Sequence, residues 1–250
     1  MRAHHKLQRL YLNDDLREGA AVTLDRDQSH YLATVLRMAE GDSVLVFNGR
    51  DGEFVARLAA AGRKAVTLAV SDRTREQAPS PDLAYCFAPL KSARLDYMVQ
   101  KAVEMGAGVL QPVVTQHTQN ARTPVERMRA NAIEAAEQCG ALSVADVREA
   151  VKFERLIDDW DPERRLIFCD EAATGAPLDS LHALGPGNTG LLVGPEGGFS
   201  NDERERLLAL PFVTAISLGP RILRADTAAV AALALVQSAI GDWRRSRSVE

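Results

Sequence analysis

The feature that most constrains the fold is an alternation of strand-like and helix-like segments from residue 83 onward. Apolar runs such as LAYCFAPL, VLQPVVT, RRLIFCDE, TGLLVG and VTAISLG are separated by stretches with helical periodicity, for example ARLDYMVQKAVEMGAG. Strands that alternate with helices form a mostly parallel sheet with helices on both faces. We therefore expect residues 83–250 to form one α/β domain.

Residues 1–72 show a different pattern, in which short β-rich runs surround one helical segment. The runs are AVTLD, SVLVFNG, GEFVARL and AVTLAV, and two turn-forming pairs, NG and DG, favour a hairpin between the second and third. The segment 73–82 is polar, contains two prolines and has no periodicity, so it is predicted to be a linker. The sequence thus predicts a small β-barrel domain ahead of the α/β domain.

Composition excludes several classes of protein. The 250 residues are 46% hydrophobic and 26% charged, which is typical of soluble globular proteins. No apolar run approaches the roughly 20 residues that cross a membrane, and the N-terminus lacks the apolar core of a signal peptide. Cys86, Cys139 and Cys169 are far apart and show no metal-ligand spacing. We expect a reduced cytoplasmic protein with buried thiols, no metal site and no membrane partner.

Two loops in the last third of the chain share one design, a strand followed by Gly-Pro and then a helix. They are LLVGPEGGFS, residues 191–200, and SLGPRILRADTAA, residues 217–229. The first is not a phosphate motif, because Phe199 stands where a P-loop needs Lys and the Glu196 carboxylate would repel phosphate. Open α/β sheets bind ligands at the carboxyl ends of their strands. We expect the two loops to hold one neutral or cationic ligand there.

These loops and three further segments resemble the SPOUT class of S-adenosylmethionine-dependent RNA methyltransferases. More narrowly, they are similar to the bacterial family that methylates N3 of a uridine, position 1498, in 16S ribosomal RNA. The further segments are HYLATVLRMAEGDSVLVFNG, KSARLDYMVQKAVEMGAGVLQPV and EAAEQCG. The resemblance implies an α/β trefoil-knot domain with a parallel sheet, preceded by a PUA-like β-barrel that binds RNA. Asp226 departs from the Glu that is usual in this family, and CGALSVADV lacks the usual Arg and Pro.

The resemblance also implies roles for individual residues. S-adenosylmethionine would be the methyl donor, and seven loop residues would surround it: Leu192, Gly194, Glu196, Gly197, Leu218, Gly219 and Leu223. Arg224 is the first candidate for a cation that stabilises deprotonated uracil, and Arg94 is the second. In the barrel, Arg9, Arg37 and Arg50 are candidate phosphate contacts.

The final helical segment indicates a further partner. From residue 225 to residue 240 only Asp226, Thr227, Gln237 and Ser238 are polar. A helix that is apolar nearly all round must be buried on most sides. A second copy of the chain would bury it, and so would the domain itself, and we favour a homodimer.

The expected partner is 16S rRNA, within the 30S subunit. Two other functions stay open at this point. One is a SPOUT methyltransferase that acts on tRNA or 23S rRNA, and the other is a non-catalytic RNA-binding factor in ribosome assembly. The net charge of −4 neither shows nor excludes an RNA-binding face.

Overall fold

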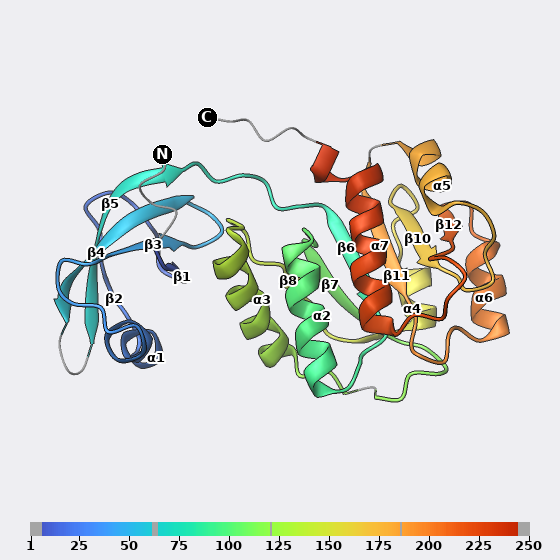
Figure 1. Cartoon of the computed structure of the whole chain (residues 1–250), viewed down its shortest axis with the longest axis horizontal. Coiled ribbons are helices and arrows are strands. Elements are labelled where there is room, and N and C mark those ends of the chain that lie inside the picture. Colours follow the sequence, from blue (N-terminus) through green and yellow to red (C-terminus); the bar gives the residue numbers. More distant parts are fainter. Residues whose placement is uncertain (1–6, 62–64, 121, 186, 245–250) are drawn as a thin grey trace. The chain divides into compact units, whose positions relative to one another are not determined.

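A computed structural model describes residues 7–61, 65–120, 122–185 and 187–244. The chain divides into two compact units (Figure 1). Unit 1 holds residues 1–80 and 136–144, and unit 2 holds residues 81–135 and 145–250. This division differs from the expected boundaries at 72 and 83. Strand β5 continues to Arg75, inside the predicted linker, and the segment 136–144 joins unit 1.

Unit 1 is a five-stranded sheet with one short helix. The strands follow the order β1 (Arg9–Tyr11), β3 (Ser43–Phe47), β4 (Glu53–Ala61), β5 (Val66–Arg75) and β2 (Ala21–Thr23). β1 is parallel to β3, and the other pairs are antiparallel. The predicted hairpin joins β3 to β4. Helix α1 (Arg26–His30) continues into the π-helical turn η1 (Tyr31–Val35).

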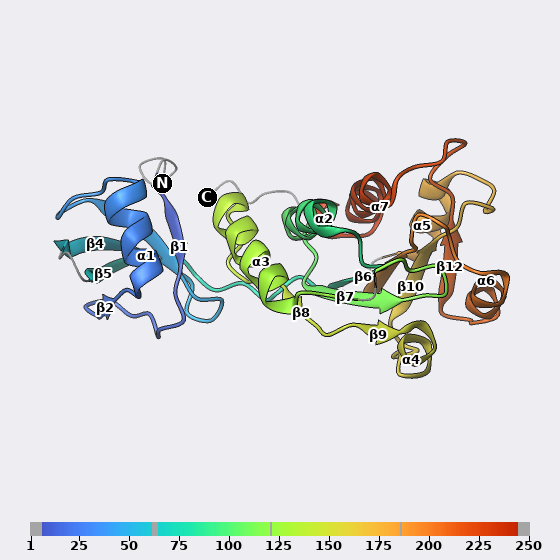
Figure 2. The same cartoon turned by 90° about the horizontal axis from the view of Figure 1, so that it is seen from below.

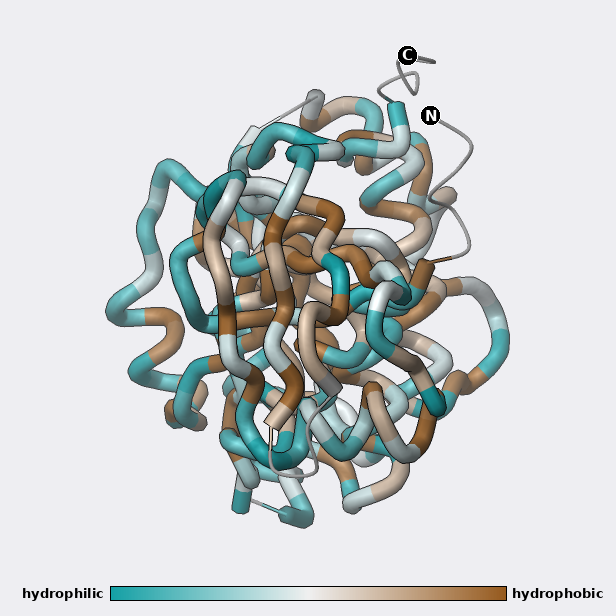
Figure 3. Tube along the Cα trace, turned by 90° about the vertical axis from the view of Figure 1, so that its left-hand side faces the viewer, coloured by the Kyte–Doolittle hydropathy of each residue, from teal (hydrophilic) through white to brown (hydrophobic). Residues whose placement is uncertain are grey.

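Alternation along the strands builds the core of unit 1. Hydrophobic and hydrophilic stretches alternate along its backbone (Figure 3), and in β5 every second residue from Val66 to Val70 is buried. These side chains pack with Leu32, from η1, and with Val44 and Val46, from β3. The period of two puts one face of each strand against the core, as the β-rich runs predicted.

Unit 2 is built on a parallel sheet, which confirms the α/β expectation. The path is β12 (Val213–Ile216), β10 (Arg165–Cys169), β11 (Thr189–Val193), β6 (Leu83–Phe87), β7 (Val109–Val114) and β8 (Asp146–Val147). β9 (Val151–Lys152) also pairs with β7. Every pair in this sheet is parallel. All carboxyl ends of the strands therefore lie at one edge.

Helices cover both faces of this sheet. They are α2 (Ser92–Glu104), α3 (Val125–Cys139), α4 (Phe153–Asp158), α5 (Pro177–Leu184), α6 (Asn201–Leu208) and α7 (Ala225–Ala239), followed by the 3-10 turn η2 (Asp242–Arg244). α2 and α7 pack together on one face, and α4 lies on the other (Figure 2). α4 and α6 share a core with Phe168 and Leu192, from the central strands β10 and β11. The fully buried strand β11 lies in the middle of this sandwich, ahead of the first Gly-Pro loop.

Candidate functional site

A cavity of about 390 Å³ opens beyond the carboxyl ends of β10, β11 and β12. Its walls come from the segments that follow these strands, and α7 contributes Ala225 and Ala228. We call it the loop cavity. Because parallel strands end at the same edge, the two Gly-Pro loops meet there, where open α/β sheets bind ligands.

Five of the residues expected to hold a ligand line the loop cavity. They are Gly194, Glu196, Leu218, Gly219 and Leu223. Leu192 instead lies fully buried in the core beneath. Gly197 is outside the lining, and a β-carbon placed on it would lie 3.3 Å from the β-carbon of His117. A side chain at position 197 would therefore contact His117 rather than enter the cavity.

Two positions of the glycine turn favour glycine for a physical reason. A β-carbon at Gly194 would lie 2.7 Å from the ring of Phe199, and that ring packs edge-on against Phe168. Gly198 has a φ of 69°, in the left-handed region that favours glycine. Its N–H donates to the carbonyl of Pro195 at 2.9 Å and closes the turn. The loop thus folds back so that Phe199 seals the core below the cavity.

A capping box ends this turn. Ser200 is the N-cap of α6, and its hydroxyl accepts a hydrogen bond from the N–H of Glu203 at 3.3 Å. The buried Glu203 carboxylate accepts from the N–H of Ser200 at 2.9 Å and from the N–H of Gln116 at 2.8 Å. The second bond ties the start of α6 to the chain that follows β7.

Charged residues that the sequence analysis missed also line the loop cavity. Asp170 is buried, and it accepts hydrogen bonds from Arg204 Nε at 2.9 Å and from the N–H of Ala172 at 3.0 Å. Glu171 and Arg221 line the same space. The signal in the sequence was the acidic pair that directly follows the strand RLIFC. Acidic and basic groups together suit a ligand that carries both a cation and a carboxylate.

Arg94 lies close to the glycine turn, although 102 residues separate it from Glu196. Its guanidinium donates from the first turn of α2 to the Glu196 carboxylate and forms an ion pair with it. The structure therefore brings together a residue expected in catalysis and one expected at the cofactor. The sequence analysis had not linked them.

Arg224 is exposed at the N-cap of α7 and does not line the loop cavity. Its backbone carbonyl accepts from the N–H of Ala228 at 2.8 Å, while its side chain has no ion-pair partner within the described residues. Asp226 lies in the first turn of the helix and accepts from the N–H of Thr227 at 2.9 Å. Within the described part of the chain, the Arg224 guanidinium is thus unpaired next to the second loop, and its role in catalysis stays a prediction.

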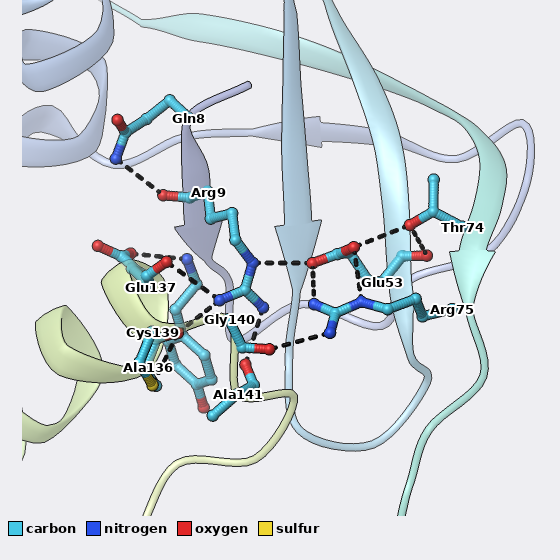
Figure 4. Close-up of polar contacts among 11 residues, drawn as sticks. Gln8, Arg9, Glu53, Thr74, Arg75, Ala136, Glu137, Cys139, Gly140 and Ala141 are labelled. Atoms are coloured by element: carbon cyan, nitrogen blue, oxygen red, sulfur yellow. Dashed lines mark hydrogen bonds and ion pairs between the residues drawn. The ribbon is translucent and has the colours of Figure 1, made fainter. Parts of the chain in front are cut away.

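The expected phosphate contact at Arg9 needs correction. The side chain is 10% exposed, and its Nε donates to the Glu53 carboxylate at 2.8 Å (Figure 4). The remaining guanidinium nitrogens donate to backbone carbonyls of the segment 136–144, among them Ala141 at 2.8 Å. Arg75 pairs with both oxygens of the same carboxylate. Arg9 is therefore a structural residue that fastens this segment inside unit 1, because buried charges need such partners.

The other two barrel arginines have accessible side chains. Arg37 is exposed and has a φ of 55°, so its backbone lies in the left-handed region. Arg50 is half-exposed, and its guanidinium donates to the carbonyl of Asn13 and to Asp15, each at 3.0 Å. Both remain candidates for RNA contacts, since exposed ion pairs are weak and easily exchanged.

The expectation of buried thiols holds fully only for Cys86, because Cys169 is half-buried. Burial raises the pKa of the Cys86 and Cys169 thiols to about 12. Cys139 is exposed instead, at the end of α3. Among the residues that the structure describes, no three His, Cys, Asp or Glu side chains cluster as a metal site would require. In the same ranges, no helix has the length and apolarity needed to cross a membrane.

Comparisons with known proteins place this architecture among RNA methyltransferases. Residues 76–237 match the family described as RNA methyltransferase domain, and residues 24–71 match the RNA methyltransferase PUA domain. A relative from Rickettsia conorii, named ribosomal RNA small subunit methyltransferase E, is 30% identical over 93% of this chain and 96% of its own. The Bacillus subtilis protein of the same name is 28% identical over 92% of this chain and 96% of its own.

Two solved structures extend the similarity to three dimensions. The small subunit methyltransferase E from Neisseria gonorrhoeae, bound to S-adenosylmethionine, has a TM-score of 0.84 and 26% identity, and the match covers 94% of this chain and 98% of that one. A Legionella pneumophila protein, described as a methyltransferase in complex with the same cofactor, has a TM-score of 0.83 and 27% identity. The match covers 95% of this chain and 99% of that one.

Proposed function

The chain belongs to the RNA methyltransferase family that includes ribosomal RNA small subunit methyltransferase E, and we propose that it methylates N3 of a uridine in 16S rRNA. S-adenosylmethionine would serve as the methyl donor. Two observations carry the proposal. The chain matches relatives of this name along nearly its whole length, and its two Gly-Pro loops line one cavity. Relatives of that name support 16S rRNA over tRNA or 23S rRNA as the substrate.

The loop cavity fits this cofactor in size and chemistry. Ligand pockets commonly enclose about 300–1,000 Å³, and the cavity, at about 390 Å³, falls in that range. Phe199, Leu218 and Leu223 offer apolar surface to a nucleobase. Glu171 and Glu196 offer negative charge to the sulfonium and ammonium groups, and Arg221 offers positive charge to the carboxylate. Leu192 and Gly197, outside the lining, would support the loop rather than contact the cofactor.

In this proposal, catalysis depends on positioning and charge. The bound cofactor would supply a methyl group whose bonding electrons stay on sulfur when uracil N3 takes the carbon. N3 must first lose its proton, which passes to water. The Arg224 side chain has no ion-pair partner among the described residues and lies beside the second Gly-Pro loop. Its charge is therefore available to the uracil anion. Arg94, paired with Glu196, is the second candidate for this role.

Unit 1 would hold the RNA through its phosphates. Residues 24–71 match a domain found in RNA methyltransferases, and Arg37 and Arg50 expose their guanidinium groups there. Such contacts position the RNA and carry no sequence information. With Arg9 committed to Glu53, these two arginines are the remaining candidates of the original three.

A homodimer would bury the surface that α7 leaves open. Most of the helix packs inside unit 2, but Val230, Ala231, Ala234 and Leu235 are only partly buried. Next to them Tyr97, from α2, is 46% exposed, and Tyr97 and Val230 border one hollow. An apolar strip of this kind on two neighbouring helices is typical of an interface between copies of a chain.

A methylation assay tests the function. Purified protein is incubated with radiolabelled S-adenosylmethionine and with 16S rRNA, 30S subunits, 23S rRNA or tRNA that lack the modification. We expect label in N3-methyluridine of 16S rRNA. We expect more label with assembled 30S subunits, in a buffer that keeps the subunits intact. Label only in tRNA or 23S rRNA would assign another substrate. Cofactor binding without label in any RNA would favour a non-catalytic assembly factor.

A further inference from the structure

A second cavity, of about 370 Å³, lies beside the glycine turn. It is bordered by the segment that leads from β6 into α2, by the chain after β7, and by Pro195 and Glu196. These last two residues also line the loop cavity. The two spaces therefore share one wall, and whatever occupies the second lies next to the cofactor.

The floor of the second cavity is apolar. Pro89 and Leu90, both buried, contribute it. A flat, weakly polar ring can lie against such a surface, as unstacked RNA bases do against protein side chains.

The rim offers groups that read the edge of a base. Gln119 is exposed, and within the described residues its amide has no hydrogen-bond partner. The Asn120 side-chain oxygen accepts from the N–H of Arg122 at 3.3 Å, which leaves its two amide hydrogens to donate. A side-chain amide presents a donor beside an acceptor. The Watson–Crick edge of uracil presents two carbonyl oxygens that flank N3, and an amide N–H can donate to either of them while N3 stays open to the methyl group.

The same rim carries positive charge. Lys91 is exposed directly before α2, and its ammonium has no ion-pair partner in the described ranges. Arg94 follows one turn later and, among the residues that the structure describes, pairs only with Glu196, and both side chains are about two-fifths exposed. Exposed pairs are weak, so a bound base can displace the carboxylate. Both cations would then face the negative charge that uracil gains when N3 loses its proton.

We propose that this second cavity receives the target uracil of the methylated rRNA. Gln119 and Asn120 read the edge of the base, while Lys91 and Arg94 face its charge. The inference rests on the proposed function and deepens it, because it places the substrate base in a cavity next to the one that fits the cofactor. Lys91, Gln119 and Asn120 are thereby new specificity-determining residues for the reaction.

Crosslinking locates the base directly. A 16S rRNA fragment, or a 30S subunit, carries 4-thiouridine at the target position and is bound to the full chain with S-adenosylhomocysteine, which prevents turnover. After irradiation, mass spectrometry identifies the attached peptide. We expect attachment within residues 89–94 or 119–122. Attachment confined to residues 218–224 or to unit 1 would overturn the proposal. The absence of any crosslinked peptide would overturn it as well.

Matched variants provide the second readout. Gln119→Ala and Lys91→Ala are compared with Gln138→Ala and Lys152→Ala, which remove the same exposed side chains elsewhere. We expect each cavity variant to lower the single-turnover rate at saturating RNA and cofactor roughly tenfold, the usual effect of losing one hydrogen bond or charge contact. Cofactor affinity, measured by calorimetry, should stay within about twofold, and the control variants should match wild type.

The outcomes separate the two proposals. Wild-type rates in Gln119→Ala and Lys91→Ala, with an active wild-type enzyme, would remove the base from this cavity and leave the function intact. A fall in cofactor affinity equal to the fall in rate would assign these residues to the cofactor and equally overturn the inference. A wild-type protein that binds cofactor but methylates no uridine of 16S rRNA would instead overturn the proposed function, and the crosslink would still report where an RNA base binds.

Discussion

The guanidinium of Arg94 and the carboxylate of Glu196 form an ion pair that joins the first turn of α2 to the glycine turn between β11 and α6. Their side chains are 41% and 44% exposed, so water screens the attraction between them. Glu196 lines both cavities, and Arg94 lines the second. The pair therefore lies between the space that fits the cofactor and the space proposed for the base.

A double-mutant cycle tests whether this pair acts as a unit. Arg94→Ala and Glu196→Gln should each change the free energy of unfolding by less than about 1 kcal/mol, because exposed pairs contribute little to stability. Each should lower the single-turnover rate, and the double variant should be no slower than the slower single variant. Rate effects that simply add would show that the two side chains act independently.

Arg224→Ala should separate catalysis from binding. If the cation stabilises deprotonated uracil, the single-turnover rate should fall by a factor of about 100 to 1,000 while cofactor affinity is kept. Arg224→Lys should recover part of the rate, and higher pH should partly rescue Arg224→Ala because more uracil is already deprotonated. Arg155→Ala, an exposed arginine on α4, is the control. Full turnover at saturating RNA, with weaker RNA affinity, would make Arg224 a phosphate contact instead.

Gly194→Ala should weaken cofactor binding through Phe199. The added β-carbon would lie 2.7 Å from the Phe199 ring, and this ring borders the loop cavity and packs on the core below. Overpacking of this kind typically costs about 1–3 kcal/mol. Calorimetry measures the affinity, and urea denaturation measures the stability. Gly194→Ala combined with Phe199→Leu should recover part of both, whereas unchanged affinity in the folded single variant would contradict the geometry.

Glu53 should make unit 1 sensitive to acid. Burial alone would raise the pKa of its carboxyl, but the hydrogen bonds and charges of Arg75 and Arg9 outweigh burial and hold the pKa below its ordinary value of 4.5. A carboxyl with a lowered folded-state pKa contributes stability above the unfolded pKa and loses it as pH falls through the folded value. Glu53 should therefore contribute fully at neutral pH and progressively less below about pH 4.5.

The matching variant is Glu53→Gln, which leaves Arg9 buried without its counter-charge. Breaking a buried pair from one side typically costs about 3–5 kcal/mol. Urea denaturation of the full chain at pH 7 and at a series of acid pH values should show this difference shrinking as pH falls. A difference that stays constant across the series would mean that the Glu53 charge does not stabilise unit 1.

Val230→Asp tests the proposed homodimer. Val230 is partly buried on the open strip of α7, so a carboxylate there should split a dimer and leave the fold intact. Ser238→Asp, at an exposed position of the same helix, should remain dimeric. Leu233 is fully buried, so Leu233→Asp should unfold the domain and is uninformative about association. Light scattering that shows a wild-type monomer at micromolar concentration would end the proposal.

Arg9 illustrates where reasoning from the sequence failed. An arginine in a predicted RNA-binding barrel is a sensible phosphate contact, and nothing in the residues around position 9 indicates otherwise. Its partners, Glu53 and the carbonyls of residues 136–141, are 44 or more positions away. Only the folded chain brings them together. The same holds for the ion pair of Arg94 with Glu196, and for the second cavity, which Lys91 and Gln119 line together.

Local patterns determined much of this protein. The period of the apolar residues defined the parallel sheet, the turn residues defined the hairpin, and Ser200 with Glu203 defined the start of α6, because each of these depends on neighbours within a few positions. The Gly-Pro loops were found in the same way. Which side chains from other segments join these loops at the cavities was decided by the tertiary structure. Burial, ion pairing and the wall that the two cavities share depend on distances between segments far apart in the chain. No local sequence pattern contains that information.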